Sequence, residues 1–207
     1  VVNAEGTSAE DTTYYESEYG ELNADNLQKL IADTYDQAVL EQEEGSVLLT
    51  NNNNALPLSQ DETSVTLFGH AVAQPLYKAA SGGSGGIEGE YCIDLYTALS
   101  DAGFSINDTL YNAYLESDTS RGTGAFDWIS QTTSEWSLGE EPSSFYTDEL
   151  KASWENDYND VAIVMFAREG GEGMEVHTQD PVEGISQLAL HQSEKDLLQM
   201  IKDSGKF

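Results

Sequence analysis

The sequence has 207 residues, with 8 Lys and Arg against 38 Asp and Glu, so its formal net charge is −30. Nucleic-acid binding depends on Lys and Arg that neutralise phosphates, and anionic membrane surfaces attract the same residues. The charge therefore excludes both kinds of partner and favours a neutral ligand, although solubility alone could explain it. Aromatic residues make up 10% of the chain, more than a disordered acidic chain would carry, and they predict a packed core in one domain.

Metal and cofactor chemistry finds little support in the sequence. Cys92 is the only cysteine, so neither an internal disulfide nor a cysteine-based zinc site can form. His70, His177 and His191 follow no metal-binding pattern, and we expect no metal and no cofactor. Without a run of 18 apolar residues, no membrane span is expected. The compartment is left open, with a secreted or cell-surface location favoured over the cytoplasm.

Strands and helices are expected to alternate along the chain. Residues 1–22 are polar and acidic and predict an extended lead-in to a domain over 23–207. Capping signals and helical spacing predict helices over about 25–44, 91–102, 109–115 and from about 193. Apolar runs predict strands over 46–50, 65–69, 104–106 and 161–166, the last of them buried on both faces. This alternation indicates an α/β fold with a mainly parallel sheet between helices.

One stretch breaks the pattern. From about 117 to 157 the periodicity fails, although the stretch is rich in aromatic residues. Long segments without clear secondary structure are uncommon in compact domains and often line functional sites. We therefore expect an irregular insertion there.

Two loops follow strands at the edge where parallel sheets hold ligands. The glycine-rich loop 81–86 fits neither the dinucleotide nor the phosphate motif. It would let its backbone and Ser84 approach a ligand closely, unless it is only a flexible linker. In the loop 168–175, Glu172 lies between two glycines just past an apolar strand. A carboxyl group presented in this way suits a general acid, and the alternative is an ordinary solvated acidic loop.

Several short motifs occur in the same order as in glycoside hydrolase family 3. Residues 44–51 (EGSVLLTN) and 54–58 (NALPL) resemble the start of the second domain of that family, and Val65 to Gly69 resembles its following strand. The further similarities are Gly83-Ser84-Gly85, the stretch from Leu95 to Leu110, Arg168 with Gly171-Glu172-Gly173, and Leu190 with Ser193-Glu194-Lys195. Together they extend from about residue 42 to the end of the sequence, except 117–157.

The resemblance implies an α/β sandwich domain that shares one site with a barrel domain of the same parent chain. The barrel would supply an Asp nucleophile for a retaining mechanism with a covalent glycosyl-enzyme intermediate. The general acid/base falls on Glu172, with Glu169 and Glu175 as competitors in the same loop. Ser84 would contact the sugar, and Arg168 would bind substrate or orient the loop. No barrel occurs in these residues, so we expect a truncated sandwich, from a member in which the sandwich precedes the barrel.

The sequence departs from the family pattern at a few positions. Gly170 stands where serine is common, Glu175 replaces an aspartate, and Thr50 replaces a lysine. The predicted function is the sandwich part of a β-glucosidase-like enzyme acting on a neutral oligosaccharide or glycoside. The alternatives are a non-catalytic carbohydrate-binding or interdomain module and an unrelated α/β binding domain. The tryptophans of the insertion would either form platforms for sugar rings or cover the sheet: Trp128, Trp136 and Trp154.

Overall fold

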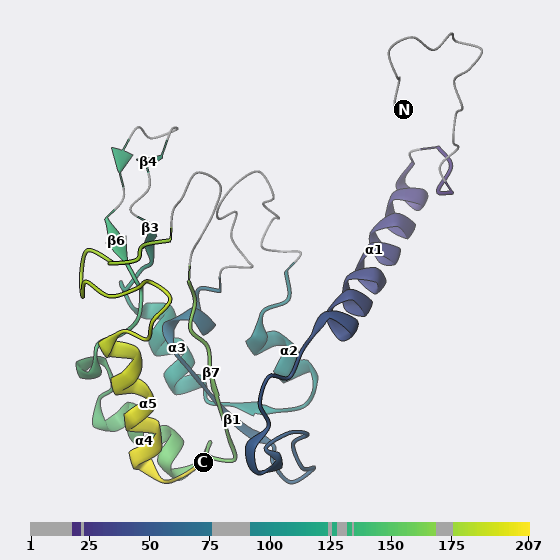
Figure 1. Ribbon diagram of the computed structural model, residues 1–207. Helices are drawn as coiled ribbons and strands as arrows, with labels where there is room; N and C mark the ends of the chain where they lie inside the picture. Colours follow the sequence, from purple (N-terminus) through teal and green to yellow (C-terminus); the bar gives the residue numbers. More distant parts are fainter. Residues whose placement is uncertain are drawn as a thin grey trace. The chain divides into compact units, whose positions relative to one another are not determined.

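The most apolar segments of the chain form a small parallel sheet. The computed structural model describes residues 18–21, 23–75, 92–123, 126–127, 132–133, 135–168 and 176–207. In it, β1 (Ser64–Phe68) lies between β2 (Ser105–Ile106) and β7 (Val161–Val164), and both pairings are parallel (Figure 1). Val65 of β1 pairs with Ile106 on one side and Val161 on the other. The α/β fold class is thereby confirmed.

The three strands differ in burial. Val65 and Phe68 of the central strand are fully buried, whereas all four residues of β7 are only partly buried. The prediction that 161–166 is covered on both faces is therefore wrong. The reason is that β7 lies at the edge of the sheet that the described residues form.

Local capping signals fix the helices around this sheet. Asp94, Asn107 and Thr147 each accept a hydrogen bond from the backbone N–H three residues later, which is how such residues begin helices. The last helix ends at Gly205, whose φ of 61° is left-handed. The helices are α2 (Leu95–Asp101), α3 (Asp108–Glu116), α4 (Asp148–Asn156) and α5 (Gln192–Ser204).

The core lies where three helices meet the central strand. Trp154 of α4, Tyr114 of α3 and Leu197 of α5 are each at most 1% exposed, and all belong to one cluster with Phe68. The rings of Trp154 and Phe68 meet edge to face at 5.2 Å. Of the two roles expected for the tryptophans, Trp154 therefore has the second: it covers the sheet.

The insertion is more regular than its sequence suggests. It contains α4 and the 3₁₀ turn η6 (Ser143–Phe145), which contradicts the expectation of an irregular stretch. The helix escaped prediction because its apolar side chains form too short a stripe for helical periodicity to show. Two antiparallel pairs of very short strands complete it: β3 (Gly122–Thr123) with β6 (Trp136–Ser137), and β4 (Phe126–Asp127) with β5 (Thr132–Thr133).

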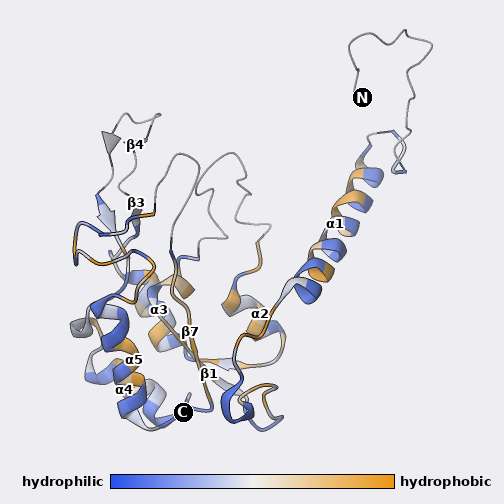
Figure 2. Ribbon diagram, in the orientation of Figure 1, coloured by the Kyte–Doolittle hydropathy of each residue, from blue (hydrophilic) through white to orange (hydrophobic). Residues whose placement is uncertain are grey.

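Residues 1–57 form a separate compact unit from 58–207. Its long helix is α1 (Ala24–Gly45), which was expected to start at about residue 25. Asn23 caps the helix, because its side chain accepts the N–H of Asn26. Polar and apolar residues are mixed along α1, and none of them is buried (Figure 2).

The predicted strand over 46–50 is wrong, since no described segment pairs with it. Across the described residues, no helix is both long and apolar enough to span a membrane.

Candidate functional site

The carboxyl ends of β1 and β7 approach each other very closely. Gly69 follows β1 with a φ of 88°, and a Cβ atom at this position would lie 2.3 Å from the carbonyl oxygen of Met165. Only glycine permits this contact. The same Cβ would lie 3.4 Å from a carboxylate oxygen of Glu140, which reaches the sheet edge from the insertion. The Glu140 carboxylate therefore lies at the edge of the sheet where parallel sheets hold ligands.

Glu140 is a partly buried carboxyl group at this edge. It accepts the backbone N–H of His70 at 3.2 and 3.3 Å and that of Glu141 at 3.0 Å. Burial raises the pKa of Glu140 to about 7, and the carboxylates of Glu194 and Glu141 add to the increase, while the two N–H donors oppose it. Glu140 can thus hold or release a proton near neutral pH.

The two neighbouring carboxylates, Glu141 and Glu194, each interact with other side chains. Glu141 lies 3.0 Å from Nδ1 of the fully buried His70 and accepts the hydroxyl of Thr119 at 2.9 Å. Glu194 pairs with Arg168. Among the described residues, Glu140 alone of the three has no side-chain partner, and its hydrogen bonds come from backbone N–H groups.

Arg168, the last described residue before 169–175, is held by a dense set of hydrogen bonds. Two of its N–H groups donate to both carboxylate oxygens of Glu194, each at 2.6 Å, and Glu194 is only 1% exposed. The remaining three donate to the carbonyl oxygens of Ala167, Gln187 and Ala189. These bonds use all five guanidinium donors. The two roles expected for Arg168, contact with a substrate and orientation of the loop, stay predictions.

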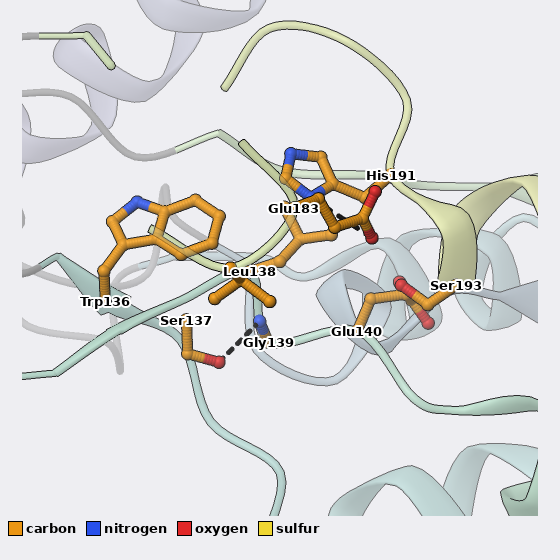
Figure 3. A pocket seen from close by; sticks show the side chains of 9 residues that line it. Trp136, Ser137, Leu138, Gly139, Glu140, Glu183, His191 and Ser193 are labelled. Atoms are coloured by element: carbon orange, nitrogen blue, oxygen red, sulfur yellow. Dashed lines mark hydrogen bonds and ion pairs between the residues drawn. The ribbon is translucent and has the colours of Figure 1, made fainter. Parts of the chain in front are cut away.

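A cavity of about 190 Å³ lies between the insertion and the start of α5 (Figure 3). Figure 3 shows the Trp136 indole at one side and Glu140 at the other, with Leu138 between them and the His191 ring above. The remaining lining residues are Ser137, Gly139, Val182, Glu183 and Ser193.

Ring contacts and a tight turn hold Trp136 in place. Its ring lies 5.6 Å from that of His191, tilted by 32°, and 6.3 Å from that of His177, nearly perpendicular. Nearby, Gly139 has a φ of 69°, and a Cβ atom there would lie within 3.0 Å of Arg121. His191 is itself almost fully buried, with Glu183 3.7 Å from its Nδ1. The tryptophan therefore forms a supported wall of the cavity.

The structure tests only part of the predicted site. Ser84, Glu172 and the competing Glu169 and Glu175 lie outside the described residues, as does Trp128. Their roles stay predictions. The described residues contain no group of three or more His, Cys, Asp or Glu that could hold a metal ion.

Sequence reasoning assigned no role in the site to Glu140, Glu194 or His191, although Glu194 belongs to one of the motifs shared with the family. Glu194 carried a signal, because it lies three residues after the helix cap His191 and accepts its backbone N–H at 2.9 Å, as in a capping box. Glu140 carried almost no signal, because the N–H group of His70 that it accepts belongs to a residue 70 positions earlier in the chain.

These observations define an α/β module with a carboxylate-rich site at the carboxyl edge of a parallel sheet. Residues 46–207 match the family described as Glycosyl hydrolase family 3 C-terminal domain. The chain therefore belongs to glycoside hydrolase family 3, and these residues form its C-terminal α/β sandwich domain, which confirms the resemblance found in the sequence. No curated protein matches the chain.

Proposed function

We propose that this chain supplies the general acid/base of a retaining β-glycosidase whose nucleophile lies on a barrel domain of the same parent chain. The observation that supports this most is the anchoring of Arg168. Its pairing with the buried Glu194 holds Arg168 four residues past β7, directly before residues 169–175 in the sequence, which include Glu172. A proton donor must be held at a defined distance from the glycosidic oxygen, and a fixed residue shortly before it would help to meet that need.

In the proposed reaction, Glu172 protonates the leaving-group oxygen while the Asp of the barrel attacks the anomeric carbon. The products of this step are a covalent glycosyl-enzyme and the free leaving group. Glu172, now ionised, then takes a proton from water, which attacks the anomeric carbon and releases the sugar. A retaining enzyme needs its two carboxyl groups about 5–5.5 Å apart, so the two domains must close over the substrate. The proposed substrate is a neutral β-glucoside or β-linked oligosaccharide.

Activity and stereochemistry test this proposal. The 207 residues alone should not hydrolyse an aryl β-glucoside or cellobiose, because they lack a nucleophile. The parent chain with its barrel should hydrolyse both and release the β-anomer first, which ¹H NMR of the fresh product detects. Turnover by the 207 residues alone, or initial release of the α-anomer, would contradict the shared retaining site. A parent chain with no activity would favour the alternative, a non-catalytic carbohydrate-binding module.

A further inference from the structure

The cavity beside Trp136 combines carboxylates with aromatic rings. Glu140 and Glu183 line it, together with the rings of Trp136 and His191 (Figure 3). All of its lining residues belong to the compact unit 58–207. The proposed reaction uses none of these four side chains, and their chemistry indicates a ligand of a different kind.

Neither lining carboxylate is paired with a Lys or Arg in the part of the chain that the structure describes. Glu140 accepts backbone N–H groups only. Glu183 accepts the N–H of Gln192 at 2.9 Å and lies 3.7 Å from Nδ1 of His191. A carboxylate can accept several hydrogen bonds, so both groups can still bind N–H donors of a ligand.

His191 adds a buried polar atom that the described residues do not satisfy. The residue is 2% exposed, and its Nε2 atom has no hydrogen-bond partner among them. An oxygen of Asp180 lies 3.7 Å away, which is too far for a hydrogen bond. Such atoms are rare in folded proteins and often mark a catalytic role or the place of a bound ion or water.

Trp136 provides the aromatic wall of the cavity. The face of an indole ring is electron-rich, and a cation within about 6 Å of the ring centre is attracted to it. The rings of His177 and His191 contact Trp136 at 6.3 and 5.6 Å, so the wall is held in place before a ligand binds. An aromatic face beside carboxylates is therefore a favourable place for an ammonium group.

We infer that this cavity binds a small organic cation, namely a protonated amine with a short apolar body. The ammonium group would lie between the indole face of Trp136 and the carboxylates of Glu140 and Glu183. Leu138 and Val182 would contact the apolar body. Pockets for drug-sized ligands are larger, about 300–1,000 Å³, so a cavity of about 190 Å³ selects a small ligand. This binding is separate from the proposed reaction and does not depend on it.

Calorimetric titration of the 207-residue chain with two ligands of the same shape tests the inference. tert-Butylammonium and tert-butanol share one apolar body and differ in the charged group. Measurements at pH 8 keep Glu140 mainly ionised, because its pKa in the folded protein is about 7. At an ionic strength fixed with NaCl, the ammonium ligand should bind at least about tenfold more tightly than the alcohol. Equal affinities, or no binding of the ammonium ligand, would overturn the inference.

Two variants locate the binding. Trp136→Leu removes the aromatic face and keeps an apolar side chain, whereas Glu183→Gln removes one charge at nearly constant shape. Each should weaken binding of tert-butylammonium about fivefold, the size expected for one cation–π or charged contact. The Glu183 side chain is 29% exposed, so Glu183→Gln should fold and decides the matter alone if Trp136→Leu does not. Unchanged affinity in Glu183→Gln would contradict the inference.

Glu135→Gln is the matched control, because Glu135 is exposed, adjoins Trp136 and does not line the cavity. It removes the same charge as Glu183→Gln and should leave the affinity for tert-butylammonium unchanged. If both variants weaken binding equally, the net charge of the chain attracts the ligand without a specific site, and the inference is wrong.

Discussion

At the scale of single residues, the most unusual group in the described structure is the Glu140 carboxyl. A buried charge is unfavourable unless it is paired or hydrogen-bonded. The nearby Glu194 is paired with Arg168, and Glu141 shares a hydrogen bond with the His70 ring. Glu140 accepts hydrogen bonds only from backbone N–H groups in the described structure, so burial raises its pKa to about 7. Such a group lowers stability when ionised and can assist binding or proton transfer when a ligand approaches.

This shift predicts a pH-dependent stability. The pKa of Glu140 is about 7 in the folded protein and 4.5 ordinarily, so between these values the folded state binds more protons than the unfolded state. Stability attributable to Glu140 therefore falls as pH rises from about 4.5 to 7 and stays low above it. Glu140→Gln should make the protein more stable at pH 8, by at most about 3 kcal/mol, with a smaller gain at pH 5.

Urea unfolding at both pH values measures this difference. Glu135→Gln, which removes an exposed carboxylate, should give the same change at pH 5 and pH 8. If Glu140→Gln also shifts both curves equally, the Glu140 carboxyl does not titrate near neutral pH in the folded protein.

At the scale of secondary-structure elements, one ion pair joins the end of β7 to the start of α5. Arg168 lies four residues past β7, and Glu194 lies in the first turn of α5. The two-pronged geometry, with both N–O distances at 2.6 Å, is the kind of contact that fixes direction as well as distance. We therefore propose that Glu194 positions Arg168 and, through it, the residues that follow in the sequence.

A leaving-group comparison tests that role. In the parent enzyme, Glu194→Gln should lower kcat/KM for cellobiose at least tenfold more than kcat/KM for 2,4-dinitrophenyl β-glucoside. The reason is that only the sugar leaving group needs protonation. Measurements belong well below the unfolding temperature, since breaking a buried pair costs about 3–5 kcal/mol. An equal loss on both substrates would show that Glu194 has a structural role only.

Sequence reasoning succeeded where the signal is local. The helices expected over about 109–115 and from about 193 are confirmed as α3 and α5. It failed where the outcome depends on tertiary contacts. The apolar run over 46–50 has strand character but no described neighbour to pair with, and Glu140 acquires its properties from His70, on a different element.

At the scale of the whole molecule, the chain combines a net charge of −30 with the C-terminal sandwich domain of glycoside hydrolase family 3. The acidic groups extend into the site itself, where Glu140, Glu183 and Asp180 surround the cavity region. This charge, from which we expect no nucleic acid as a partner, agrees with the neutral sugar proposed as the ligand. In this account, catalysis requires a second domain. The sandwich domain supplies groups for proton transfer and binding, and the proposed nucleophile lies on the barrel.

The most direct measurement of the central claim is azide rescue of the Glu172→Gln variant in the parent enzyme. The variant should hydrolyse cellobiose about 10²–10⁴-fold more slowly, the usual contribution of general acid–base catalysis. With 2,4-dinitrophenyl β-glucoside, added azide should restore turnover and yield β-glucosyl azide, because azide attacks the glycosyl-enzyme without needing a base. Near-normal hydrolysis of cellobiose by Glu172→Gln, combined with loss of activity in Glu169→Gln or Glu175→Gln, would contradict the account.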